Sequence, residues 1–167
     1  MRRRRGSLVP IQTRSTNLDD IGYIADIHTA RHGTPPDKGR EWAERVIRRS
    51  IDESENWLFL IAEHDGTRIG FARAGHFVPP DGAPGNCCPT AWYLLGVVIR
   101  EKSRRQGADR LAWIAARADE AWFFLDTDNE ASLALHAEFG FEEITRDFWF
   151  PGSNFDRAGG ILLHARV

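Results

Sequence analysis

The chain of 167 residues has the composition of an ordinary globular domain, with 42% hydrophobic and 28% charged residues. A chain of this length can bury about 70% of its unfolded surface, so a single domain can form a core without disulfides or a metal. Lysine and arginine number 22 against 24 aspartate and glutamate residues, which gives a net charge of -2. No nucleic-acid partner is expected, because dedicated nucleic-acid binders usually carry an excess of positive charge.

Neither a membrane span nor a metal centre is expected. The longest apolar runs, Trp57–Ala62 and Tyr93–Ile99, have the length of strands and fall well short of the roughly 18 residues that cross a bilayer. The basic start, Met1–Arg5, is not followed by the hydrophobic segment of a signal peptide, so we expect a cytoplasmic protein. The two cysteines, Cys87 and Cys88, are adjacent and cannot form a CxxC metal or redox site.

The first half of the chain predicts a strand, two helices and a hairpin. Residues 8–14 alternate as in an edge strand, and Asn17 is a typical N-cap for a helix that ends near Gly33. Pro35-Pro36 separates that helix from a second one, whose apolar residues run from Trp42 to Ile51. The strands expected over Trp57–Ala62 and Ile69–Val78 are joined by Asp65-Gly66, which favours a tight hairpin turn.

The second half predicts alternating strands and helices. Residues 79–86 have the composition of a surface loop, and a buried strand is expected over Ala91–Ile99. The elements expected after it are a helix from Ser103, a strand over Trp122–Leu125, a helix over Asn129–Phe139, and strands over Phe141–Phe150 and Gly160–Ala165.

The element order β α α β β β α β α β β predicts one α/β (α+β) domain over residues 8–167. We expect about seven strands in a mixed, mostly antiparallel central sheet with helices on both faces, because parallel neighbours need crossover connections. Residues 1–7 are expected to form a flexible arginine-rich tail.

A basic turn follows the strand that ends at Ile99. It reads Arg104-Arg105-Gln106-Gly107-Ala108-Asp109 and precedes a predicted helix. Backbone N–H groups at such a helix start can bind an anion, and Gly107 lets a ligand approach the chain closely. The turn lacks the GxxxxGK[ST] and GxGxxG patterns of common nucleotide sites, and a solvated basic helix start is the alternative interpretation.

This turn resembles the diphosphate signature of the GNAT superfamily of acyl-CoA-dependent N-acetyltransferases, Arg/Gln-x-x-Gly-x-Gly/Ala. Arg104 and Gly107 fit the signature, and Asp109 departs from its last position. As a residue of the first helical turn, an aspartate stabilises the helix. Beside a diphosphate it repels the ligand by roughly 3 kcal/mol at an effective dielectric near 20 and about 5 Å separation.

A second segment, residues 129–141, is similar to the family's Asn-x-x-Ala-x-x-Leu-Tyr-x-x-x-Gly-Phe. Asn129, Leu135, Gly140 and Phe141 match that pattern. Ser132 and His136 stand where the family has alanine and tyrosine. The two motifs together are far more specific than either one alone, and the element order extends the resemblance over nearly the whole chain.

The resemblance implies acetyl-CoA as the cofactor. In such folds the fourth and fifth strands splay apart, so the backbone near Val97–Ile99 would bind the pantetheine amides as an added strand does. The diphosphate would lie over the basic turn, and the helix that starts at Asn129 would face the pantetheine. The implied cofactor contacts are Val97, Val98, Ile99, Arg104, Arg105, Gln106, Gly107, Ala108, Asp109, Asn129, Ser132 and His136.

The resemblance also implies transfer of an acetyl group to a primary amine in a ternary complex, without a nucleophilic cysteine. An alkyl amine with a pKa of about 10 must lose a proton, and Glu63, His64, His76 and Tyr93 are the candidate acceptors. His136 is expected to protonate the departing thiolate in place of the family's tyrosine. The alternative for His136 is a helix-surface or cofactor-contacting residue.

Several acceptors and more than one assembly state agree with the sequence. The acceptor is a small-molecule or peptide amine, and His32, Asp37, Trp149 and Phe150 are further candidates for its pocket, against loop or packing roles. Sheet edges in such folds often pair between two copies, so the resemblance is compatible with a homodimer. Asp109 and the missing tyrosine favour the alternative function, a non-catalytic acyl-CoA-binding or protein-interaction domain on a degenerate scaffold of the same fold.

Overall fold

The first four strands pair in sequence order, each antiparallel to the one before it. A computed structural model describes residues 11–99, 119–155 and 159–166. These strands are β1 (Gln12–Ser15), β2 (Trp57–His64), β3 (Thr67–Phe77) and β4 (Ala91–Ile99). Between β2 and β3, Asp65 and Gly66 both have positive φ, 50° and 68°, as the predicted tight turn requires.

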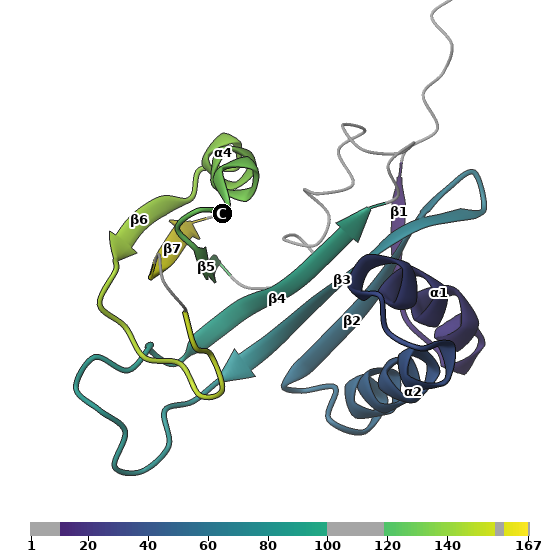
Figure 1. The fold of residues 1–167 in the computed structure, drawn as a ribbon, viewed down its shortest axis with the longest axis horizontal. Coiled ribbons are helices and arrows are strands. Elements are labelled where there is room, and N and C mark those ends of the chain that lie inside the picture. The colour runs from purple at the N-terminus through teal and green to yellow at the C-terminus, as the bar shows by residue number, and fades with distance from the viewer. Residues whose placement is uncertain (1–10, 100–118, 156–158, 167) are drawn as a thin grey trace, which may run out of the picture.

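The remaining strands extend the sheet beyond β4. They are β5 (Glu120–Asp126), β6 (Glu142–Thr145) and β7 (Gly160–Arg166). The sheet has seven strands in the order β1-β2-β3-β4-β5-β7-β6, and only β4 and β5 are parallel neighbours among the described strands (Figure 1). The predicted mixed and mostly antiparallel sheet is therefore confirmed.

Helices cover both faces of this sheet (Figure 1). They are α1 (Ile21–His32), preceded by the 3-10 turn η1 (Leu18–Asp20), then α2 (Pro36–Asp52) and α4 (Glu130–Glu138). Phe71 of β3 packs with α1 and α2, whereas its neighbour Ala72 belongs to the cluster that receives Leu133 of α4. Successive strand residues point to opposite faces, so α1 and α2 lie on one face and α4 on the other.

Along the described part of the chain, no helix is both long and apolar enough to cross a bilayer.

One predicted strand is shorter than expected. The sequence favours a strand over Phe141–Phe150, but β6 ends at Thr145. The backbone of Trp149 turns to the loop before β4 instead, donating to the carbonyl of Asn86 and accepting from the N–H of Cys88, both at 2.9 Å. The aromatic residues of this segment therefore fill the core from a loop, because packing on neighbouring rings does not require a strand.

Two other expectations fall partly or wholly outside the described residues. The edge strand predicted over residues 8–14 corresponds to β1, of which the structure describes Gln12–Ser15. The helix expected from Ser103 and the tail expected over residues 1–7 lie outside the described residues.

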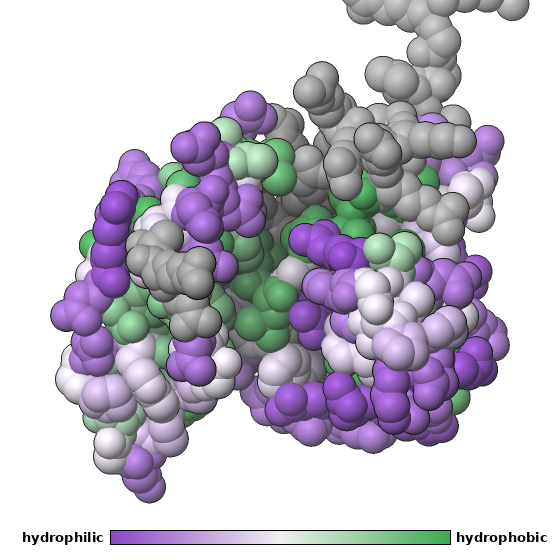
Figure 2. Space-filling model, in the orientation of Figure 1, coloured by the Kyte–Doolittle hydropathy of each residue, from purple (hydrophilic) through white to green (hydrophobic). Residues whose placement is uncertain are grey.

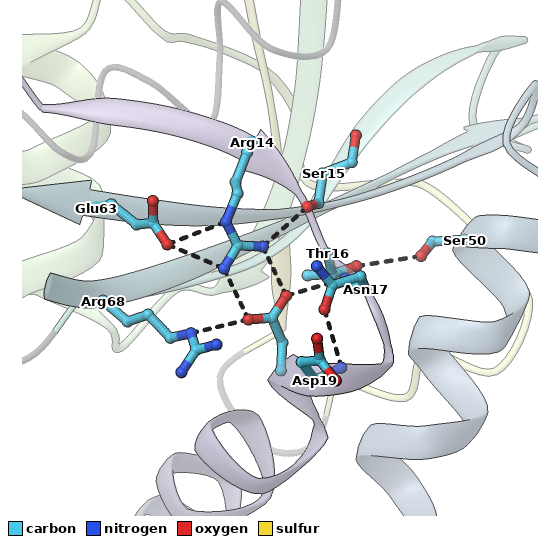
Figure 3. A network of polar contacts seen from close by, with 9 residues as sticks. Arg14, Ser15, Thr16, Asn17, Asp19, Ser50, Glu63 and Arg68 are labelled. Atoms are coloured by element: carbon cyan, nitrogen blue, oxygen red, sulfur yellow. Dashed lines mark hydrogen bonds and ion pairs between the residues drawn. The ribbon is translucent and has the colours of Figure 1, made fainter. Parts of the chain in front are cut away.

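A buried carboxylate joins β1, β3 and the start of α1 (Figure 3). Asp20 is fully buried and accepts hydrogen bonds from Arg14 at 2.7 and 2.9 Å and from the N–H of Asn17 at 2.9 Å. Arg68 forms an ion pair with it at 2.9 Å. Burial alone would raise the pKa of Asp20, but these hydrogen bonds and positive charges hold it below its usual value.

Candidate functional site

β4 and β5 are parallel and are paired at a single aligned residue pair, Tyr93 opposite Trp122. On the opposite edge of β4, the ladder with β3 continues to Ile99. Within the described residues, β4 therefore has no strand aligned on its β5 side from Leu94 to Val98, and Figure 1 shows the end of β4 pointing away from β5. An extended ligand can bind such an edge through main-chain hydrogen bonds, as an added strand does.

A β-bulge lies at the start of this diverging segment. Arg73 of β3 is aligned with Gly96, and the next residue, Ala74, is aligned with Leu94, so Leu95 is the extra residue. The Nη2 of Arg73 donates to the carbonyl oxygen of Leu95 at 3.3 Å. Bulges re-aim the backbone locally, and this one is held by a side chain from the neighbouring strand.

A pocket of about 300 Å³ reaches the same part of β4 from the face that carries α1 and α2. Figure 2 shows the molecule hollowed between the part with α1 and α2 and the part with β5 to β7, with apolar side chains inside the hollow. The described lining of the pocket consists of Ile27, His28, Arg31, His32, Trp42, Phe71, Arg73, Leu95, Gly96, Val97 and Val98. Within the described residues, the diverging strand thus has an edge without a paired strand towards β5 and a pocket on its α1 and α2 face.

His28 is held in the wall of this pocket by aromatic contacts. Its ring stacks on Trp42 with the centroids 3.9 Å apart, and it lies 4.6 Å from the ring of His32, one turn later on α1. Burial, followed by the nearby positive charges of His32 and Arg73, lowers the pKa of His28. The ring is therefore neutral near pH 7 and can accept a proton.

Arg73 places a positive charge inside the pocket. Its guanidinium lies 5.1 Å from the ring centroid of Trp42, and burial lowers its pKa. Among the described residues no carboxylate forms an ion pair with Arg73, and its buried Nε has no hydrogen-bond partner. Arg73 is half-buried, and a buried N–H without an acceptor is costly, so its guanidinium is available for an anionic ligand.

The cofactor contacts predicted from the sequence lie partly on the diverging strand. Val97 and Val98 line the pocket, and Val97 also packs on the cluster that receives Leu133 of α4. Ile99 ends β4 and is buried. The predicted diphosphate contacts Arg104, Arg105, Gln106, Gly107, Ala108 and Asp109 lie outside the described residues.

The predicted residues of α4 bond to their own helix. The Oδ1 of Asn129 accepts from the N–H of Ser132 at 3.2 Å, which caps the helix start. His136 is buried, stacks on Phe123 with the centroids 4.0 Å apart, and has its Nδ1 2.7 Å from the carbonyl oxygen of Ser132. A carbonyl only accepts, so Nδ1 carries a proton and Nε2 donates only when the ring carries both protons.

None of the four candidate proton acceptors lines the pocket in the described structure. Tyr93 is fully buried, its hydroxyl donates to the carbonyl of Pro89 at 2.8 Å, and burial raises its pKa. Glu63 binds Arg14 at 2.9 Å, His64 ends β2, and His76 packs edge-on against Trp92.

The pocket residues could have been found from two sequence signals. His28 and His32 are four residues apart, which places them on one face of a helix. Arg73 interrupts the otherwise apolar middle of β3, where a charge is unusual. Of the further pocket candidates, His32 lines the pocket, whereas Asp37, Trp149 and Phe150 do not.

Comparison with solved structures gives matches over nearly the whole chain. A ribosomal-protein-alanine N-acetyltransferase from Brucella melitensis is 20% identical, with a TM-score of 0.60, covering 93% of this chain and 99% of that chain. The PaiA N-acetyltransferase from Thermoplasma acidophilum, in complex with coenzyme A, is 14% identical, with a TM-score of 0.58, covering 95% and 99%. The yncA protein from Salmonella typhimurium, with its cofactor acetyl-CoA, is 18% identical, with a TM-score of 0.58, covering 93% of both chains.

A comparison with curated proteins finds no match. The family model described as Acetyltransferase (GNAT) family matches residues 23–141, which is more than half of the chain. That span runs from α1 through the diverging β4 to the end of α4, and so contains the pocket and the strand edge described above. The chain belongs to the GNAT family of acetyltransferases.

Proposed function

We propose that the protein transfers an acetyl group from acetyl-CoA to a primary amine, directly within a ternary complex. The observation that carries this proposal is the divergence of β4 from β5 beside a pocket that reaches the same strand residues. Structural relatives bound to coenzyme A and to acetyl-CoA support the choice of cofactor. The acceptor is a small-molecule or peptide amine, and it enters from the pocket side.

The described residues fit a pantetheine arm at the β5 side of β4. Amide groups of that arm can pair with the backbone of Val97–Ile99, as an added strand does. Asn129 and Ser132 at the start of α4 are proposed to face the arm, and the amides of residues 104–109 to hold the diphosphate. When bound, acetyl-CoA supplies a thioester as the acyl donor.

The pocket supplies a group that can remove the proton from the amine. His28 is neutral near pH 7 and lines the pocket together with Leu95–Val98 of β4, so it is our proposed proton acceptor. A backbone N–H near Val98 or Ile99 is proposed to stabilise the oxyanion. His136 remains the proposed acid for the thiolate, acting from Nε2 when its ring carries both protons.

The cysteines support direct transfer rather than an acyl-enzyme route. Cys88 is 1% exposed, and burial raises its pKa to about 11. It is therefore a thiol near pH 7, whereas a cysteine nucleophile acts as the thiolate. Neither Cys87 nor Cys88 is among the described residues that line the pocket.

Initial rates of coenzyme A release test the proposal, with acetyl-CoA and a panel of primary amines varied together. The expected result is amine-dependent release with intersecting reciprocal plots, because both substrates must be bound before the acetyl group moves. Cys88→Ala should retain this activity. Parallel plots would contradict direct transfer, and the absence of amine-dependent release across the panel would contradict the proposed function.

A further inference from the structure

We propose that the acceptor is a small amine that also carries a carboxylate, and that Arg73 binds this carboxylate in the pocket. The inference rests on the proposed function and names its substrate class. Its starting point is the half-buried Arg73, which lines the pocket, has a buried Nε without a hydrogen-bond partner and pairs with no carboxylate among the described residues.

The donors of Arg73 are only partly used within the described structure. One donation goes from Nη2 to the carbonyl of Leu95 at 3.3 Å, and the face of the guanidinium lies over Trp42. A guanidinium carries five N–H donors in a planar fork that matches the two oxygens of a carboxylate. The buried and unsatisfied Nε is one of these donors, so a carboxylate at this position would satisfy a group that otherwise costs stability.

The other charges around the pocket favour the same ligand. Its described lining carries the positive charges of Arg31 and Arg73, together with the rings of His28 and His32, and no aspartate or glutamate. A pocket with this charge repels polyamines and other multiply cationic acceptors, while an anionic group gains from it. Because His28 is neutral, it does not repel the single ammonium group of the acceptor, and it can accept a proton from that group.

The position of Arg73 limits the distance between the two groups of the acceptor. Arg73 is aligned with Gly96, in the β4 segment where the acyl donor is proposed to bind, and its Nη2 lies 3.3 Å from the carbonyl of Leu95. The carboxylate and the reacting amine must therefore be separated by only a few bonds. A pocket of about 300 Å³ also fits a small molecule. Amino acids and close relatives meet both conditions.

Matched trios of acceptors test this inference, each made of an amino acid, its carboxamide and the amine left when the carboxylate is removed. The wild-type protein should favour the amino acid in kcat/KM. Arg73→Met should lower kcat/KM for the amino acid by about 30-fold or more and should change kcat/KM for the carboxamide little. Only the carboxylate of the amino acid loses a charged partner. Arg73→Lys keeps the charge without the planar fork, so its kcat/KM for the amino acid should lie between those of the wild type and of Arg73→Met.

Other outcomes would overturn the inference. Equal kcat/KM across each trio would show that the carboxylate is not recognised. An equal loss for all three acceptors in Arg73→Met would assign Arg73 to supporting Leu95 and Trp42 alone. Preference for an aminoalkylphosphonate over the amino acid of the same length would show that Arg73 recognises a phosphoryl group instead of a carboxylate.

Two binding measurements separate this inference from the proposed function. Calorimetric titration of acetyl-CoA reports on the cofactor site alone, so failure there contradicts the proposed function. Titration of the preferred amino acid into the protein without acetyl-CoA reports on the pocket alone, and should show binding that Arg73→Met abolishes. Acetylation of uncharged amines with no response to a carboxylate would leave the function standing and contradict only the inference.

Discussion

Two histidines one turn apart on α1 line the pocket, and His28 is the proposed proton acceptor. His28 stacks on Trp42, and burial together with the nearby His32 and Arg73 lowers its pKa, whereas His32 is itself exposed. Because the pKa of His28 is lowered, its ability to accept a proton is retained at pH values below the usual histidine pKa of about 6.5.

His28→Asn should lower kcat by about 100-fold while leaving acetyl-CoA affinity unchanged, since a general base contributes on that scale. The acidic limb of the wild-type pH profile should lie below about pH 6.5. His32→Asn removes one charge that lowers the pKa of His28, so it should move this limb to higher pH. Steady-state rates from pH 5 to 9 measure all three effects.

His64→Asn is the matched control for these variants, because His64 ends β2 outside the pocket lining. It should keep the wild-type rate and pH profile. Full activity of His28→Asn, or a loss in His64→Asn equal to that in His28→Asn, would contradict the assignment of the proton acceptor.

Substitution of Gly96 tests the location of the acceptor, because a side chain at this position would narrow the pocket. A Cβ added there would lie 3.7 Å from the Nη2 of Arg73, an ordinary contact, so Gly96→Ala should fold normally and fill part of the pocket. We expect kcat/KM for the acceptor to fall roughly tenfold, the scale of one methylene group in a specificity pocket, with a smaller effect on acetyl-CoA affinity. Gly22→Ala, on α1 with open space around the new methyl group, should leave both unchanged. Unaltered acceptor kinetics in Gly96→Ala would contradict the location of the acceptor.

At the scale of elements, the Asp20 network joins the start of α1 to the sheet. Asp20 is the centre of contacts from Arg14 on β1, Arg68 on β3 and the backbone of Asn17, and Arg14 also binds Glu63 on β2. The carboxylate therefore fixes the helix that carries His28 and His32 against β3, which carries Phe71 and Arg73 of the pocket.

Asp20→Asn should lower the free energy of unfolding by about 3 kcal/mol, because it leaves two arginines without their buried partner. The pKa of Asp20 is lowered in the folded protein, so its contribution is present above the unfolded value of about 3.9 and is lost as pH falls through the lower folded value. Urea unfolding between pH 3 and 7 measures both effects. Asp19→Asn, at an exposed neighbouring position, should change stability by no more than about 0.5 kcal/mol. Equal stability of the two variants would contradict the role of the network.

Elements with local signals could be predicted from the sequence, and elements decided by distant contacts could not. Asp65-Gly66 has the positive φ values of its predicted turn, and Gly33 ends α1 with φ 62°. The strand expected to reach Phe150 stops at Thr145, because the backbone bonds of Trp149 go to a loop some 60 residues earlier in the chain. Of the expected acceptor-pocket residues only His32 lines the pocket, and His28 and Arg73 were not among them, because the pocket assembles α1, α2, β3 and β4.

At the scale of the whole molecule, the proposed function depends on the divergence of β4 from β5. β4 stays aligned with β3 to its end, apart from the bulge at Leu95, while it leaves β5 after Tyr93. The motif resemblance predicted the family and this divergence, and the family model and the strand pairing confirm both. The acceptor class could not be predicted in this way, because it depends on side chains that meet only in the folded protein.

Calorimetric titration of acetyl-CoA into the full chain, at low and moderate salt with free coenzyme A as the control, tests the central claim most directly. We predict binding in the micromolar range that weakens with salt, because the proposed diphosphate contacts are largely electrostatic. Such binding would also show that the basic turn tolerates Asp109. No binding at millimolar acetyl-CoA would contradict the account and favour a domain of this fold that no longer uses the cofactor.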